Sequence, residues 1–158
     1  MGHECENLTI SPDMESVVLV EAWADEAERV RLCLRPTDRV YRIHRTCASN
    51  GKAFMAERIS LPAALFPGLT ERAFLAHRIV PLAKAYSVRL GMAQERVSIG
   101  TASAAAAGAL GLGEGWRVLV LDRVVMTSDG RPAEWRVAEC NLTEEHLSAL
   151  SRAAGNVA

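Results

Sequence analysis

The chain has 158 residues, of which 49% are apolar and 23% charged, a composition typical of one ordinary globular domain. Its 18 basic and 19 acidic residues leave a net charge of −1, which argues against a duplex DNA-binding surface, because such domains are usually strongly basic. No apolar run approaches the ~18 residues of a membrane helix, and the N-terminus does not resemble a signal peptide. Four cysteines without paired spacing indicate reduced thiols, so we expect a cytoplasmic protein.

The first half of the chain predicts alternating strands and one helix. Residues 1–15 are polar, and we expect them to be flexible. The elements that follow are a strand at 16–21, a helix at 22–34, and strands at 39–48 and 53–61. Asn50-Gly51 lies between the last two strands, and this dipeptide is the strongest short signal for a β-hairpin.

The second half of the chain repeats this pattern after a helical insert. The insert predicts a short helix at 71–76 and a second helix at 78–90, closed by Gly91. The later elements are a strand at 96–100, an alanine-rich helix at 103–109, strands at 116–127 and 132–139 around Asp129-Gly130, and a last helix from Thr143. We expect residues 152–158 to be flexible.

An offset of 78 residues aligns the two halves. The series Ala24, Ala27, Leu32, Leu34, Val40 and Arg45 reappears as Ala102, Ala105, Leu110, Leu112, Val118 and Arg123. Each half therefore predicts a helix, a strand, a tight turn and a strand. This period is too long for a solenoid repeat, so the sequence predicts an α+β domain with internal duplication. Its helices would cover a mainly antiparallel sheet of about six strands.

Two arginines are the first candidates for chemistry. Arg45 and Arg123 each fall on the apolar side of a strand, where a charge is costly unless it is paired. Each could form an internal salt bridge, or its guanidinium could bind a carboxylate or phosphate. Glu57 is the natural partner of Arg45 across the hairpin. In the strand expected at 132–139, strict alternation puts Glu134 on the same side as Arg136. Either this strand bulges or Glu134 faces solvent.

His77 is the remaining candidate, near the start of the main predicted helix. A lone histidine is most often a surface or capping residue, but at a helix N-terminus beside a cleft it would add a hydrogen-bond donor. The sequence contains no HExxH, GxSxG, Cys/His cluster or phosphate-binding loop. We therefore expect neither a metal nor a cofactor.

Several short motifs occur together in a specific order. Arg45 is followed by Asn50-Gly51 and Glu57, then by Leu61-Pro62 and Phe66-Pro67-Gly68-Leu69. Later come Tyr86, Gly91, Leu110-Gly111-Leu112, Arg123, and the run from Asp129 to Glu134. From about Glu21 to Glu139 the chain resembles the UTRA domain, the effector-binding half of GntR-type transcription regulators of the HutC subfamily.

The resemblance implies a chorismate lyase-like fold over residues 16–151, with a small-molecule effector between the sheet and the helical insert. The family's pocket positions correspond here to Arg45, Glu57, His77 and Glu134. Members that bind sugar phosphates tend to carry a second arginine at the position of Cys47. A small carboxylate metabolite is therefore the expected effector. The family also implies a homodimer.

Three functions compete. The resemblance favours an effector-sensing, dimerising domain of a bacterial transcription regulator, without enzymatic activity. Because only about 20 residues precede the repeat, we expect that this chain lacks its own DNA-binding domain and does not bind DNA alone. A chorismate lyase-type enzyme acting on a small carboxylate would share the fold, and a structural partner domain would bind no ligand.

Overall fold

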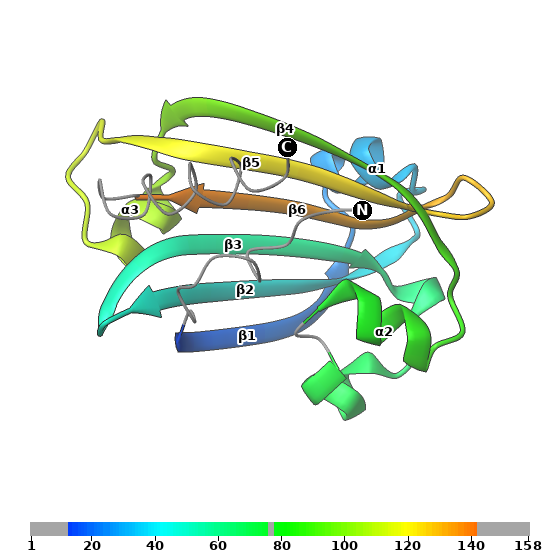
Figure 1. The fold of residues 1–158 in the computed structure, drawn as a ribbon. Helices are drawn as coiled ribbons and strands as arrows, with labels where there is room; N and C mark the ends of the chain where they lie inside the picture. Colours follow the sequence, from blue (N-terminus) through cyan, green and yellow to red (C-terminus); the bar gives the residue numbers. More distant parts are fainter. Residues whose placement is uncertain (1–12, 76–77, 142–158) are drawn as a thin grey trace, which may run out of the picture.

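Six strands form one antiparallel sheet in the computed structural model, which describes residues 13–75 and 78–141 (Figure 1). They are β1 (Asp13–Trp23), β2 (Arg39–Ser49), β3 (Lys52–Pro62), β4 (Leu90–Thr101), β5 (Arg117–Thr127) and β6 (Pro132–Cys140). Their order across the sheet is β1-β2-β3-β6-β5-β4. This order is symmetric about the junction of β3 and β6, so each repeat contributes three neighbouring strands. The predicted α+β fold is confirmed.

Two helices occupy equivalent places in the repeats. They are α1 (Glu26–Leu32) and α3 (Ala104–Leu110). Asp25 and Ser103 cap their first turns, and left-handed residues, Cys33 and Gly111, end them. The two N-terminal caps are 78 residues apart, and so are the two C-terminal caps, so the duplication extends to the helix ends. No helix in the described part of the chain is long and apolar enough to cross a membrane.

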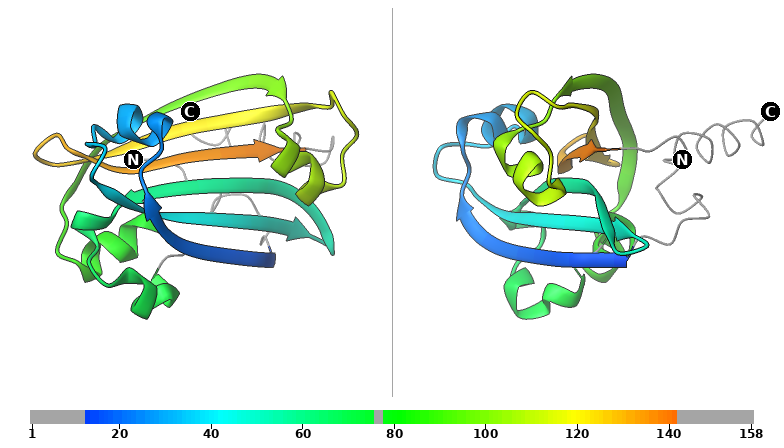
Figure 2. Two further views of the ribbon diagram at one scale, coloured as in Figure 1. Left: turned by 180° about the vertical axis from the view of Figure 1, so that it is seen from behind. Right: turned by 90° about the vertical axis from the view of Figure 1, so that its left-hand side faces the viewer.

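The helical insert lies on the other face of the sheet. It consists of α2 (Ile79–Ala85) and the 3₁₀ segments η2 (Ala63–Leu65) and η3 (Leu69–Leu75). Successive strand side chains point to opposite faces. Val40 therefore packs with Leu32 of α1, while its neighbour Tyr41 packs with Leu82 of α2. We call these the α1/α3 face and the α2 face; Figures 1 and 2 show the helices that cover them.

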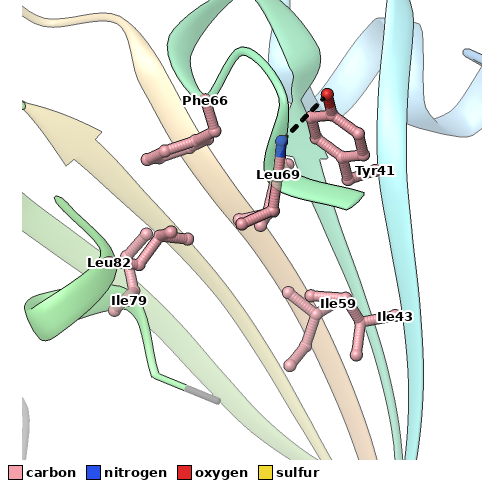
Figure 3. Packing of buried hydrophobic residues seen from close by; sticks show 8 residues of the cluster. Tyr41, Ile43, Ile59, Phe66, Leu69, Ile79 and Leu82 are labelled. Atoms are coloured by element: carbon pink, nitrogen blue, oxygen red, sulfur yellow. Dashed lines mark hydrogen bonds between the residues drawn. The ribbon is translucent and has the colours of Figure 1, made fainter. Parts of the chain in front are cut away.

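The main apolar core joins the insert to the first three strands (Figure 3). Its buried members are Tyr41, Ile43, Ile59, Leu61, Phe66, Leu69, Ile79 and Leu82. The Leu69 backbone N–H donates to the Tyr41 hydroxyl at 3.3 Å, so the buried phenol has a partner. Burial of these side chains anchors the insert on β2 and β3, because each contributes about 1.5–3 kcal/mol.

The two hairpins are formed by the predicted turns. Asn50 and Gly51 both have positive φ, 53° and 73°, as a two-residue type I′ turn requires. The second loop is longer, and Gly130 adopts φ 84° in it. The extra length accounts for the shift of the second turn within the repeat.

Two helices are shorter in the structure than the sequence predicts. The helix expected at 78–90 ends at Ala85, after which Val88 and Leu90 pack on the core beside α2. Gly91 lies within β4, and a Cβ there would come within 2.9 Å of the Thr127 carbonyl oxygen. Gly91 therefore permits close strand packing and does not cap a helix.

The helix expected from Ala22 begins four residues later, at Glu26. Ala22 pairs with Val40 in the sheet, and Asp25 starts the helix with a capping box. The side chain of Asp25 bonds the first-turn backbone, which sets the helix start. The helix predicted from Thr143 lies outside the described residues.

A buried carboxylate ties α1 to the sheet. Glu28 is fully buried and accepts hydrogen bonds from Arg42, Arg58 and Ser60 at 2.7–3.0 Å. It also accepts one from the Asp25 backbone N–H at 2.9 Å. Burial raises the pKa of Glu28, but these hydrogen bonds outweigh burial and lower the pKa to about 2 from an ordinary 4.5.

We predict that Glu28→Gln lowers the free energy of unfolding at pH 7 by about 2 kcal/mol, because the half-buried Arg42 and Arg58 lose their anion. Since the folded-state pKa of Glu28 is depressed, its contribution is complete above pH 4.5 and is lost as the pH falls towards 2. Urea denaturation at pH 7 and pH 3 measures both effects. Glu26→Gln, at an exposed site in the same helical turn, is the control and should change little.

Candidate functional site

Three of the predicted site residues belong to a buried charged band on the α2 face. Its centre is Glu57, whose side chain is 0% exposed. Arg45 Nε donates to one carboxylate oxygen of Glu57 at 2.5 Å, and Arg136 Nε donates to the other at 2.6 Å. Arg136 Nη2 also contacts this second oxygen. The Arg45–Glu57 pair expected from the sequence is therefore present.

The charge of Glu57 is stabilised by its neighbours. Burial raises the pKa of Glu57, but the charges of Arg136 and Arg45 and their hydrogen bonds lower it below its ordinary value. Glu57 is thus an anion at neutral pH although its side chain is out of water. This part of the sheet therefore stabilises a buried carboxylate.

A second ion pair continues the band on β5 and β6. Arg123 Nη2 donates to Glu134 Oε1 at 2.9 Å, and the two side chains are 9% and 4% exposed. Within the described ranges, Arg123 Nε is buried and has no hydrogen-bond partner. The sequence left two possibilities for Glu134, a bulged strand or a solvent-facing side chain. Glu134 is buried, so it does not face solvent. The pairing of β5 and β6 is irregular beside it, between Val125 and Met126.

The band lies next to the insert. Arg45 and Glu57 follow Ile43 and Ile59 on the same face of β2 and β3, and those two residues belong to the core that holds α2. On the other side of the pair lies a second apolar cluster that includes Cys47 and Met55. His77, the fourth predicted site residue, lies outside the described residues.

Arg136 is the member of the band that the sequence analysis did not select. It lies opposite Arg123 in the β5–β6 pairing, as Glu57 lies opposite Arg45 in the β2–β3 pairing. Its alternation with Glu134 and its equivalent place in the repeat are the signals that could have identified it. The cross-strand contact with Glu57 depends on β3 pairing with β6, which the sequence pattern does not specify.

Comparison with known proteins gives one family and several solved structures. The UTRA domain family model matches residues 8–143. The structure resembles the ligand-binding domain of a GntR-family transcriptional regulator from Bordetella bronchiseptica with a TM-score of 0.71 and 25% identity, covering 85% of this chain and 86% of that one.

Two further solved structures share the fold. A GntR-family transcriptional regulator from Enterococcus faecalis has a TM-score of 0.69 and 21% identity, covering 82% of this chain and 92% of that chain. PhnF from Mycobacterium smegmatis has a TM-score of 0.73 and 19% identity, covering 92% and 65% respectively. The family match spans most of the sequence, and the fold agrees with it. The chain belongs to the UTRA domain family, the effector-binding regulatory domains of GntR-type transcription regulators.

Proposed function

We propose that this domain senses a small carboxylate metabolite through the charged band on the α2 face, as a UTRA domain of the HutC subfamily acting in the bacterial cytoplasm. Arg45 would contact the effector carboxylate, with Glu57 and Glu134 beside it and His77 at the rim. The observation that carries the proposal is the ionised, buried Glu57 between Arg45 and Arg136. An effector carboxylate at this place would meet the same guanidinium groups.

The guanidinium group of Arg45 is largely shielded from water. Its side chain is 13% exposed, so an anion that reaches it forms a charge-assisted hydrogen bond at low dielectric. Cys47 occupies the position two residues further along the same face of β2. It provides no second guanidinium there, so a singly charged carboxylate suits the site better than a doubly charged phosphate.

We predict that Arg45→Met abolishes stabilisation by an effector carboxylate. Binding at ~100 times the dissociation constant stabilises a protein by about 2.7 kcal/mol. The variant should still fold, because Glu57 keeps its contacts with Arg136. The measurement is thermal unfolding with acetate, pyruvate and benzoate, each against its neutral amide, and with inorganic phosphate.

The matched control for this experiment is Arg39→Met, which removes another ion-paired arginine of β2 whose side chain is 40% exposed. Arg39→Met should leave the stabilisation by a carboxylate intact. If a carboxylate stabilises Arg45→Met as much as it does the parent protein, Arg45 is only an internal salt-bridge partner and the site assignment is wrong.

The second part of the proposal is a homodimer. β1 and β4 are the two edges of the sheet, and unpaired edge strands favour association. β4 is the more exposed edge: Met92, Val97 and Ile99 are 71%, 58% and 67% exposed. Pairing or packing of β4 across a two-fold axis would cover these side chains.

We predict that multi-angle light scattering gives the mass of a dimer at micromolar concentration. Ile99→Glu should shift the mass towards a monomer, because it places a charge on the apolar edge. Ser98→Glu, on the opposite side of the same strand, tests whether any added charge has this effect. A monomer mass for the parent protein over a wide concentration range would contradict the dimer.

A further inference from the structure

A cavity of about 540 Å³ lies on the α1/α3 face, away from the charged band. Its walls come from α3 and from β2, β3 and β6. Arg45 and Glu57 also border it, but strand alternation directs their side chains to the α2 face. The wall residues from these elements include His44, Ala105, Ala106, Ala109, Trp135 and Glu139.

The duplication explains why this space is open. Glu28 and Arg31 of α1 correspond, 78 residues later, to Ala106 and Ala109 of α3. In the first repeat Glu28 fills the gap between helix and sheet, and Arg31 reaches Asp122 at 2.5 Å. In the second repeat two methyl groups replace these long side chains. The helix position is retained, and the volume beneath it is left empty.

The chemistry of the walls disfavours an anionic ligand. Both oxygens of Glu139 already accept hydrogen bonds at 2.7 Å, from the Ser103 backbone N–H and hydroxyl. Arg58 is paired with Asp25 and Glu28 at 2.6 and 3.0 Å. The donors to Glu139 are neutral, so its carboxylate keeps its charge and repels an anion. An anionic ligand would therefore lose hydration while meeting one carboxylate and a guanidinium that is already ion-paired.

Two wall residues provide recognition. Burial lowers the pKa of His44, and the charges of Arg58 and Arg42 lower it further, which favours the neutral imidazole. A neutral imidazole both donates and accepts a hydrogen bond. Trp135 contributes an aromatic surface, and its Nε1 is already bound to Asp122 at 3.0 Å. Alanine methyl groups and Val137 add apolar surface, beside the hydroxyl groups of Thr46, Ser60 and Ser103.

We propose that this cavity is a second small-molecule site, separate from the charged band, for a neutral aromatic compound with one polar group. Its volume falls within the range of ordinary ligand sites, about 300–1,000 Å³. The aromatic part packs against the alanines of α3, and the polar group bonds His44. The site does not depend on Arg45, so it stands whether or not the charged band binds a carboxylate.

The test uses indole and benzamide as neutral probes and benzoate as the charged counterpart of benzamide. In protein labelled with ¹³C at the alanine methyl groups, saturable shifts are expected at Ala105, Ala106 and Ala109 with the neutral probes. The dissociation constant of benzoate, measured from these three signals, should be at least tenfold higher than that of benzamide. If neither neutral probe shifts them, or if benzoate binds there as well as benzamide, the proposal is wrong.

Matched variants locate the binding. Ala109→Leu fills the cavity and should weaken neutral-probe binding at least tenfold, whereas Ala104→Leu, at an exposed position of the same helix that does not border the cavity, should not. Ala105→Leu provides the same test if Ala109→Leu fails to fold. Arg123→Met, in the charged band but not on the cavity wall, should leave neutral-probe binding unchanged. Unchanged affinity in the cavity-filling variant, or its loss in Arg123→Met, would overturn the proposal.

Discussion

The burial of the Glu57 carboxylate constrains the centre of the sheet. A carboxylate out of water is costly unless charged donors surround it, and here they come from strands of both repeats. Arg45 is on β2 of the first repeat, and Arg136 is on β6 of the second. β3 and β6 are the strands at which the two halves meet. The contact between Glu57 and Arg136 therefore requires that β3 and β6 pair in this register. A slip by one residue would move these side chains to the other face of the sheet.

The two repeats share a backbone and differ in how their helices are held. Hydrogen bonds recur at equivalent positions, such as Ala24 N–H to Asp38 and Ala102 N–H to Trp116. The helix of the first repeat is held by ion pairs that converge on Glu28, whereas the second helix has alanine at the equivalent position. Packing at an alanine-rich helix leaves space that polar side chains fill in the first repeat. Duplication therefore preserved the frame while the two halves acquired different chemistry.

The two faces of the sheet also differ in the side chains they carry. On the α2 face three guanidinium groups surround the buried carboxylates of Glu57 and Glu134, where hydrogen bonds between charged groups are strong. On the α1/α3 face Arg58 pairs with Asp25 and Glu28 of the first repeat, Glu139 is hydrogen-bonded to Ser103, and alanine side chains form much of the remaining cavity wall. The same strands, β2 and β3, carry both sets of side chains, because alternate residues point in opposite directions.

The sequence alone determined the strands, the duplication, the hairpin turns and the family. These features follow from local patterns, such as the Asn50-Gly51 turn and the alternation that placed Arg45 and Glu57 on one face. It predicted the helix ends poorly, because the stop at Ala85 depends on Val88 and Leu90 packing on a distant core. Likewise, only tertiary structure decided that Arg136 reaches Glu57 and that a cavity lies beneath α3. Both depend on how β6 and α3 are placed against the first repeat, and contacts between residues so far apart in sequence leave no periodic signal.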